Sequence, residues 1–224
     1  MIQLIDLSKS FGTNTVLDHL SFTFEKGVVY GIVGKNGAGK TTLFRCLTGL
    51  ERFKGSITAD VSPLKNHLMF LPTEPFFYNM MTGLEYVDYI CSARQYKVKN
   101  ISSKNIFNIP LNQYISTYSS GMKKKLALFA VLLQDVDCYI LDEPFNGIDF
   151  QSSMILFDLI ELLKDKHKTV VISSHIFSTL KQSCDEIVLL EDKRFKCHVN
   201  KEQFDWLEDR IHAESMDVNL NIWE

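Results

Sequence analysis

The sequence lacks several features that would assign it to particular classes of protein. Its five cysteines are scattered, with no Cys-x-x-Cys pair, so neither a zinc site nor a disulfide framework is indicated. No apolar stretch approaches the roughly 18 residues needed to cross a bilayer. The longest, residues 126–133, is expected to be a core helix. The amino terminus has no basic region followed by an apolar run, so we expect no signal peptide and a cytosolic protein.

Other signals are missing as well. Basic residues are not in excess, and the net charge of -3 argues against a nucleic-acid-binding surface. The sequence has no low-complexity segment, no linker rich in proline, glycine or serine, and no internal repeat. It also lacks the Asn-Lys-x-Asp motif that reads guanine, which disfavours a GTPase. With this length, we expect residues 1–224 to form a single domain with a subdomain inserted in it.

The apolar residues predict an α/β fold. Residues 20–24 alternate apolar and polar side chains, which indicates a half-buried antiparallel strand in an N-terminal β subdomain. Short continuous apolar runs follow, as a parallel sheet covered by helices requires, at residues 28–33, 138–141, 170–172 and 187–190. Helical repeats fall between these runs, at Leu43, Leu47 and Leu50 and at Ile155, Leu159, Leu162 and Leu163.

Residues 76–118 differ from the rest of the chain. They contain no convincing strand, and residues 85–94 are their best helix. We therefore expect an inserted, mostly helical subdomain between about residues 76 and 118.

A glycine-rich loop follows the strand predicted at residues 28–33. It fits G-x-x-x-x-G-K-[ST] and leads directly into the predicted Leu43 helix. Glycines allow successive N–H groups to face one point, and the start of the helix adds a positive dipole end, so the loop suits phosphate. Lys40 can reach the β and γ phosphates, and the Thr41 hydroxyl can ligate Mg²⁺. The candidate binding residues are Gly34, Asn36, Gly37, Ala38, Gly39, Lys40, Thr41 and Thr42.

Acidic residues and a histidine follow two of the predicted strands. Ligands of open α/β sheets bind outside the carboxyl ends of the strands, where Asp142, Glu143 and His175 are expected. Asp142 is placed to hold Mg²⁺, directly or through water. Glu143 can accept a proton from the attacking water or orient it. The His175 imidazole can hydrogen-bond the γ-phosphate or that water. Thr73 follows another predicted strand and is also polar, but a threonine at this place is by itself only weak evidence of a functional site.

The order of these motifs resembles the ATP-binding cassette family over nearly the whole chain. Residues 118–122, Tyr-Ser-Ser-Gly-Met, look like its signature L-S-G-G-Q, and residues 147–149, Gly-Ile-Asp, look like its D-loop. His175 matches the family's switch histidine, and Phe11 the aromatic residue that stacks on adenine. A buried strand aromatic is the alternative for Phe11. The resemblance implies a P-loop NTPase core that binds ATP and Mg²⁺ and hydrolyses ATP.

The resemblance also implies partners. Two cassettes pair head to tail, so that Ser119 and Gly121 contact the γ-phosphate on the other cassette and Asp149 organises the interface. Ser119 has a local role as well, because it precedes a helical run that it can cap. The dimer powers a separate integral membrane subunit from the inner face of the cell membrane, and the pattern looks most like export-type cassettes. The second cassette is either a copy of this chain, giving a homodimer, or a different chain, giving a heterodimer.

Three departures from the family pattern affect the expected activity. Ser120 replaces a signature glycine and Met122 a glutamine, although Ser119 and Gly121 remain. Thr73 aligns with the glutamine of the Q-loop and is shorter, so its metal contact is expected through water or through Glu74. Phe150 stands where proline is common. We still expect an active ATPase, with two alternatives: a non-hydrolysing partner subunit, or a soluble mechanical ATPase acting on nucleic acid or ribosomes.

Two further segments have more than one interpretation. The three lysines at residues 123–125 are interpreted as a solvated helix start, and a site for a phosphate-rich partner is the alternative. The aromatic and methionine residues between 76 and 81 suit either core packing or a surface for a short helix of the membrane subunit.

Overall fold

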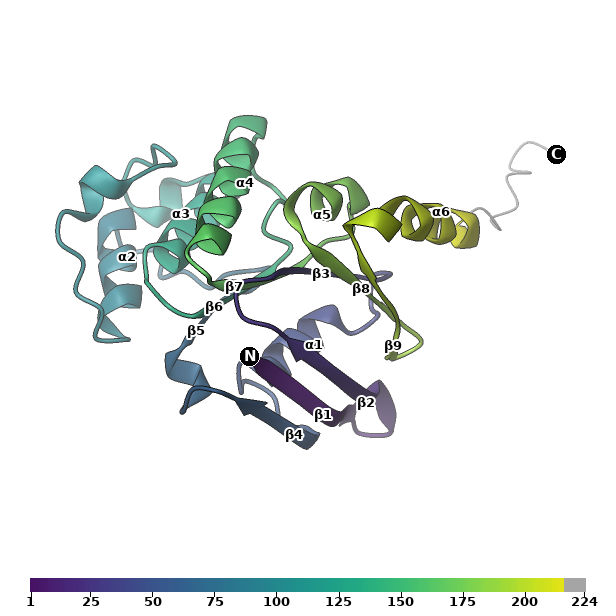
Figure 1. The fold of residues 1–224 in the computed structure, drawn as a ribbon. Helices are drawn as coiled ribbons and strands as arrows, with labels where there is room; N and C mark the ends of the chain where they lie inside the picture. The colour runs from purple at the N-terminus through teal and green to yellow at the C-terminus, as the bar shows by residue number, and fades with distance from the viewer. Residues whose placement is uncertain (216–224) are drawn as a thin grey trace.

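The computed structural model describes residues 1–215, which fold around two β-sheets (Figure 1). The smaller sheet is antiparallel, in the order β2-β1-β4, and consists of β1 (Ile2–Phe11), β2 (Asn14–Phe24) and β4 (Lys54–Ala59). The larger sheet has the order β5-β6-β7-β3-β8-β9 and is parallel except for β9. Its strands are β3 (Val29–Val33), β5 (Leu68–Leu71), β6 (Cys138–Asp142), β7 (Thr169–Ser173), β8 (Glu186–Glu191) and β9 (Arg194–Asn200).

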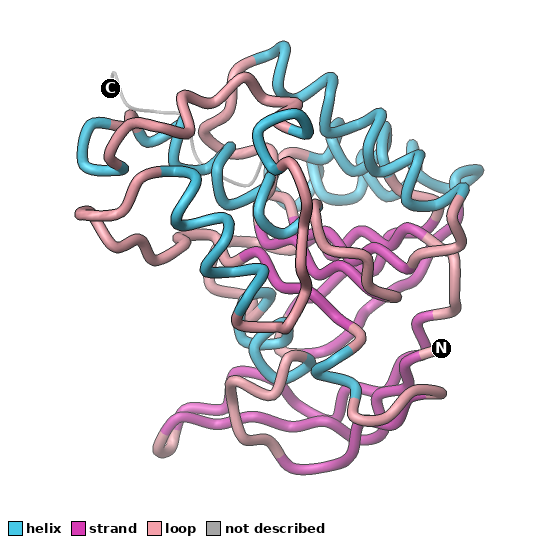
Figure 2. The backbone as a smooth tube through the Cα atoms, turned by 90° about the vertical axis from the view of Figure 1, so that its left-hand side faces the viewer, coloured by secondary structure: helices cyan, strands magenta, loops and turns pink. Residues whose placement is uncertain are grey.

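Helices cover both faces of the larger sheet. Helix α1 lies between the two sheets, and α3, α4, α5 and α6 pack on the opposite face of the larger sheet, with α2 beside α3 (Figure 1 and Figure 2). The α-helices are α1 (Lys40–Leu47), α2 (Gly83–Ser92), α3 (Ser120–Leu132), α4 (Phe150–Asp165), α5 (Phe177–Ser183) and α6 (Phe204–Ser215). Short 3₁₀ helices are η1 (Leu64–Asn66), η2 (Ile101–Lys104), η3 (Ile115–Thr117) and η4 (Lys201–Gln203). The predicted α/β fold, with its parallel sheet and N-terminal antiparallel sheet, is confirmed.

The continuous apolar runs are explained by burial on both faces of the strands. Every residue of β3 is buried. Val29 and Val33 pack into the cluster on the side of α3 and α4, whereas Tyr30 and Ile32 pack into the cluster around α1. Because both faces of such a parallel strand are buried, neither face carries the polar residues that a solvent-exposed face would have.

The first helix is shorter than its apolar repeat predicts. Helix α1 ends at Leu47, and Gly49 adopts the left-handed conformation with φ 74°. Glycine reaches this region without steric cost and commonly ends a helix there. Leu50, which the repeat places on the helix, lies beyond its end and is 64% exposed.

Residues 76–118 are all described, and they are less helical than expected. They contain one α-helix, α2, which Thr82 and Glu85 begin with a reciprocal capping box. The 3₁₀ helices η2 and η3 and irregular chain make up most of the remainder. Gln95, Asn100 and Asn108 adopt positive φ values, which an α-helix of L-residues cannot accommodate. The division of the chain into a core and an inserted subdomain remains a prediction.

Helix α3 contains the apolar run predicted to be a core helix. Residues 126–131 of this helix are buried. Within residues 1–215, no helix combines the length and the apolar character that a bilayer span requires.

Candidate active site

Four loops meet at one edge of the larger sheet because their strands are neighbours. The order β5-β6-β7-β3 places the carboxyl ends of these parallel strands side by side. Thr73 follows β5, Asp142 ends β6, His175 follows β7, and the glycine-rich loop follows β3. Asp142 is paired directly with Ser173, the last residue of β7. The candidate residues are thus assembled by strand order.

Residues 34–42, here called the phosphate loop, require glycine at several positions. A Cβ on Gly34 would lie 2.3 Å from the Leu190 carbonyl oxygen, closer than any side chain allows. Gly37 and Gly39 have φ values of 83° and 107°, in the region that favours glycine. Gly39 is also the N-cap of α1 and provides no side-chain cap, so the first amides of the helix have no capping partner from it. Uncapped amides at the positive end of a helix are a site for an anion.

The Lys40 side chain folds back across the phosphate loop. Its ammonium donates to the carbonyl oxygens of Gly34 and Lys35, at 2.6 and 3.2 Å, and the residue is buried. Burial lowers the pKa of Lys40, and the charges of Glu143 and Asp142 oppose that shift. A buried cation beside a set of uncapped amides is well placed to receive a phosphate.

Three hydroxyl groups donate to the Asp142 carboxylate. Thr41 and Thr73 contact Oδ2 at 2.7 and 2.8 Å, and Ser173 contacts Oδ1 at 2.5 Å. Thr73 thus reaches Asp142 directly, although it is shorter than the glutamine of relatives. Two hydroxyls and a carboxylate oxygen are hard ligands that suit Mg²⁺. Within residues 1–215 there is no group of three or more His, Cys, Asp or Glu side chains arranged for a metal. A divalent cation here would therefore need ligand oxygens to complete its shell, as Mg²⁺ does with phosphates.

Glu143 and His175 are in direct contact. Glu143 Oε2 lies 2.8 Å from His175 Nδ1, and the Glu143 side chain is only 12% exposed. Glu143 adopts a left-handed backbone with φ 51°, and its N–H donates to the Ser173 hydroxyl at 3.0 Å. A non-glycine residue in this conformation is strained, and such strain is concentrated at functional sites. The turn aims the carboxylate toward the phosphate loop side of the sheet edge.

Two cavities adjoin the phosphate loop. One, of about 410 Å³, is lined by Asn36, Gly37, Gly39, Lys40, Thr41, Thr42, Thr73, Asp142, Glu143 and Val16. The other, of about 580 Å³, is lined by residues 14–16 of β2, residues 33–38, His175, residues 189–193 around the turn between β8 and β9, and Ile211. The phosphate loop separates the two, and the smaller cavity contains both the metal candidates and Glu143.

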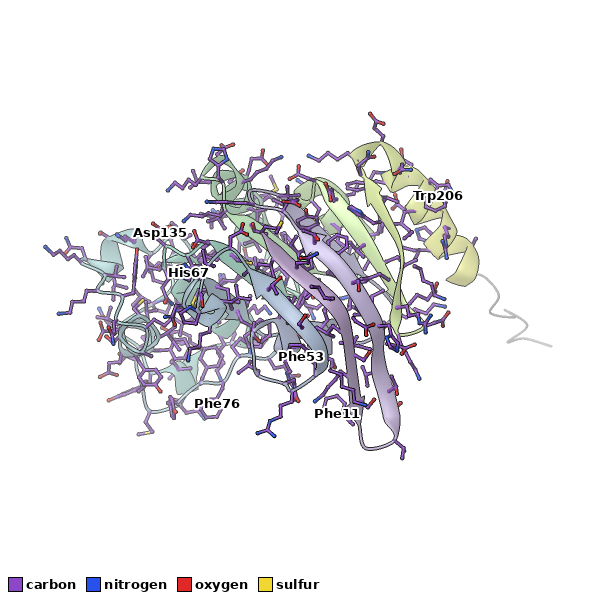
Figure 3. All side chains as sticks on the ribbon, turned by 60° about the horizontal axis from the view of Figure 1, so that its bottom comes forward. Phe11, Phe53, His67, Phe76, Asp135 and Trp206 are labelled. Atoms are coloured by element: carbon purple, nitrogen blue, oxygen red, sulfur yellow. The ribbon has the colours of Figure 1, made fainter. Side chains whose placement is uncertain are left out.

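Phe11 lies at the end of the β1–β2 hairpin and lines neither cavity (Figure 3). Its ring is 48% exposed, so the alternative of a buried strand aromatic is wrong. The Lys9 ammonium lies 4.4 Å from the ring centroid. In the pairing of β1 with β2, Ser10 opposes Thr15, which leaves Phe11 on the same face as Val16. Val16 lines both cavities, so Phe11 lies on the face of the hairpin that borders the phosphate loop.

Ser119, Gly121 and Asp149 form a separate group. The Ser119 hydroxyl caps α3 by accepting from the Met122 N–H at 3.2 Å. A Cβ on Gly121 would lie 2.9 Å from the Gly147 carbonyl oxygen, so the signature and the D-loop are packed together. Asp149 caps α4, and its pKa is lowered by the Ser152 N–H and by the Lys125 ammonium. None of these three predicted residues lines the cavities at the phosphate loop of its own chain.

The interpretation of residues 123–125 as a solvated helix start is wrong for two of the three lysines. Lys124 is 6% exposed, and its ammonium contacts the carbonyl oxygens of Thr73 and Asp142 at 3.2 and 3.4 Å. Burial lowers its pKa to about 8. Lys125 pairs with Asp149 at 2.9 Å. The burial of these lysine side chains depends on the segments that pack against the first turns of α3. The three-lysine sequence alone does not predict that packing.

Lys124 and Ser173 are the residues of the site that sequence reasoning missed. Ser173 was readable in part, because a serine ends the buried strand next to the one that ends in Asp142. Its hydroxyl links the Asp142 carboxylate to the Glu143 amide, so it fixes the orientation of both residues.

Comparisons with known proteins agree with this geometry. The family model described as ABC transporter matches residues 17–146, more than half of the chain. The chain is 28% identical over 218 residues to the SkfA peptide export ATP-binding protein SkfE of Bacillus subtilis (strain 168), and the match covers 92% of this chain and 91% of SkfE.

Two solved structures share the fold. The structure of an ATP binding subunit of an ABC transporter superposes with a TM-score of 0.86 at 23% identity, covering 96% of this chain and 98% of the other. The dimeric ATP-binding cassette MJ0796, in a post-hydrolysis state bound to ADP and Pi, superposes with a TM-score of 0.79 at 16% identity, covering 90% and 99%. With the motifs, the site geometry and the family match together, the chain belongs to the ABC transporter family, as an ATP-binding ATPase of that family.

Proposed function

We propose that the chain binds Mg-ATP on the phosphate loop, hydrolyses it with Glu143, and works as a head-to-tail dimer that drives an integral membrane subunit. One observation carries the catalytic part. Thr41, Thr73 and Asp142 bring their oxygen atoms together beside the buried Lys40, and the Glu143 carboxylate borders the same cavity. This arrangement is what transfer of a phosphoryl group to water requires.

Each side chain has a distinct role in the proposed site. The Lys40 ammonium contacts the β and γ phosphates, together with amides of Gly34, Asn36, Gly37, Ala38, Gly39, Thr41 and Thr42. Thr41, Asp142 and Thr73 hold Mg²⁺, directly or through water. When bound, the ion would neutralise the negative charge that develops on the phosphate oxygens. The exposed Phe11 ring stacks on adenine.

Glu143 and His175 act on the attacking water. The Glu143 carboxylate accepts the proton as the water oxygen attacks the γ-phosphorus and ADP leaves. The His175 imidazole holds that carboxylate through the 2.8 Å contact and lines the larger cavity beside the phosphate loop, and we assign it a hydrogen bond to the γ-phosphate. The intact Glu143–His175 pair favours a hydrolysing subunit over the alternative of one that only holds ATP.

The signature supports the dimer. Ser119 and Gly121 lie at the positive end of α3, a natural anion site, yet neither lines a cavity at the phosphate loop of the same chain. In a head-to-tail dimer, the γ-phosphate bound to the second cassette would contact Ser119 and Gly121 of this chain. Asp149, which ties the D-loop to Lys125 on α3, lies beside that interface. MJ0796, which shares this fold, has been solved as a dimer.

Dimerisation is tested with the Glu143→Gln variant and size-exclusion chromatography. In saturating Mg-ATP we expect the variant to elute as a stable dimer, because the γ-phosphate that bridges the two cassettes is not removed. In Mg-ADP it should elute as a monomer, and the unmodified chain should dimerise only transiently. A Glu143→Gln protein that stays monomeric in Mg-ATP contradicts the head-to-tail model.

The segment between β5 and α2 supports docking of a membrane subunit. Phe76 and Met80 are 73% and 83% exposed, and Tyr78 is exposed beside them, whereas Phe77 and Met81 pack against the core. Core packing thus explains only part of this segment. Phe76, Tyr78 and Met80 form the surface, here called the aromatic patch, to which we assign a short helix of the membrane subunit. Such docking would place the chain on the inner face of the cell membrane.

Co-purification from cells that express the membrane subunit tests the aromatic patch. We expect the double variant Phe76→Ser, Met80→Ser to lose at least about tenfold of the co-purified membrane protein, since exposed hydrophobic anchors dominate such interfaces. The ATPase activity of the isolated chain should persist. The control is Trp206→Ser, which removes an exposed aromatic side chain, 53% accessible, at the far end of the molecule (Figure 3). Equal recovery of the membrane protein with the patch variant and the control would contradict the assignment.

A further inference from the structure

Lys124 is a buried cation with an unusual set of partners. It lies in the second turn of α3, 6% exposed, and its ammonium contacts only main-chain oxygens, those of Thr73 and Asp142. Within residues 1–215, its ammonium forms no ion pair, and the charges of Asp142 and Glu143 act on it only from a greater distance. Burying an ammonium without a paired carboxylate is costly, and an apolar side chain of the same length would pack at lower cost. The two main-chain contacts and the charges of Asp142 and Glu143 offset only part of that cost, so a role beyond stability is indicated.

The two oxygens come from the two strand ends that hold the metal candidates. Thr73 follows β5 and Asp142 ends β6, and the hydroxyl of Thr73 already contacts the carboxylate of Asp142. One ammonium thus ties three segments together: the turn after β5, the turn between Asp142 and Glu143, and the start of α3. Charge-assisted hydrogen bonds of this kind are stronger than neutral ones, so they resist separation of these segments.

The start of the same helix presents the signature. Ser119 caps α3 and Gly121 lies in its first turn, only three residues before Lys124. A helix transmits a displacement along its axis as a rigid element, so a shift at the strand ends moves Ser119 with them. In the dimer of the proposed function, Ser119 faces ATP on the other cassette. Lys124 then stands between the ATP site of its own chain and that of its partner.

We propose that Lys124 is a positioning residue that couples occupancy of the ATP site in its own chain to the placement of Ser119 on the ATP of the second cassette. The proposal rests on the head-to-tail dimer proposed above. It assigns to Lys124 a role in dimer closure and in cooperativity between the two sites, with no contact to ATP. Loss of the ammonium should therefore leave ATP binding to the monomer intact and weaken the ATP-dependent dimer.

The test introduces Lys124→Met into the Glu143→Gln protein. Methionine keeps the length and packing of the stem and removes the donor. We expect the ATP-dependent dimerisation constant, measured by sedimentation velocity, to weaken by about tenfold or more, within the usual range of coupling between sites. The Kd of the monomer for Mg-ATP, measured by titration calorimetry at low protein concentration, should change by less than about threefold. With Glu143 restored, the Hill coefficient for ATP hydrolysis should fall toward one.

The matched control is Lys123→Met, in the same helix turn. Lys123 is partly exposed. Its replacement by methionine removes the same charge from α3 but leaves the contacts of Lys124 to Thr73 and Asp142 intact. We expect this variant to dimerise as its parent does. If Lys123→Met and Lys124→Met weaken the dimer equally, the effect belongs to net charge and the inference is wrong.

The remaining outcomes separate the inference from the proposed function. A Glu143→Gln parent that stays monomeric in Mg-ATP overturns the dimer and the inference with it. A parent that dimerises, together with an unaffected Lys124→Met protein, overturns the inference alone. So does a loss of ATP affinity as large as the loss of dimerisation, because it would indicate a local packing role. If Lys124→Met does not fold, Lys124→Gln, which keeps a neutral donor, is expected to weaken dimerisation by at least about threefold, and an unchanged dimer again overturns the inference.

Discussion

Replacing Glu143 by Gln is expected to lower kcat for ATP hydrolysis by about 10²–10⁴-fold, the contribution typical of a general base. The amide has nearly the same shape as the carboxylate but cannot accept the proton of the attacking water. The Kd for Mg-ATP should stay within about threefold of the unmodified value, because Glu143 is not assigned any contact with the phosphates before the reaction. Phosphate release under saturating Mg-ATP measures kcat, and equilibrium titration measures Kd.

The control for this variant is Glu74→Gln, which removes a neighbouring carboxylate. Glu74 is exposed and does not line the cavity that contains Asp142 and Glu143. The Glu74→Gln variant should retain nearly full ATPase activity. A large loss of activity would instead support the expectation that the metal contact at the end of β5 runs through Glu74. Hydrolysis that persists in Glu143→Gln at more than about a third of the normal rate would remove Glu143 from the reaction.

The second large effect is expected for Lys40→Ala, on binding. The Lys40 ammonium is buried over the loop, and we expect it to exchange its two carbonyl contacts for contacts to phosphate oxygens when ATP enters. Charge-assisted hydrogen bonds contribute about 1.5–3 kcal/mol each. Losing two of them should weaken the Kd for Mg-ATP by at least about 10²-fold. Titration calorimetry measures this loss directly.

Lys35→Ala is the matched control, since it removes a lysine from the same loop. The Lys35 side chain is exposed, and only its main-chain oxygen contacts Lys40. We expect its Kd for Mg-ATP to change by less than about threefold, in accord with the small value of exposed charges. Equal weakening in Lys35→Ala and Lys40→Ala would show that net charge, and not the buried ammonium, carries binding.

The parts of the site that the sequence predicts well are those encoded locally. The phosphate loop follows from a contiguous motif, because glycine conformation, helix start and lysine all lie within nine residues. The positions of Asp142 and His175 follow from one further rule, that parallel strands present their carboxyl ends at one edge. The apolar runs predict these strands because both faces are buried, as the two clusters around β3 show.

The parts that the sequence does not predict depend on packing between distant segments. Lys124 reads as one of three solvated lysines, and only the approach of α3 to the ends of β5 and β6 buries it. Ser173 acquires its role from its register with Asp142, which no local pattern encodes. Leu50 fits the apolar repeat of α1, but the left-handed Gly49 ends the helix before it.

The most direct test of the account is a crystal structure of the Glu143→Gln protein with Mg-ATP. We predict a triphosphate along residues 34–42 with Lys40 on its β and γ phosphates, and Mg²⁺ beside Thr41, Asp142 and Thr73. The residue 143 side chain should face a water next to the γ-phosphorus, with Ser119 of a second copy on the far side. A phosphate loop that remains empty under saturating Mg-ATP, or a residue 143 side chain turned away from the γ-phosphate, would contradict the account.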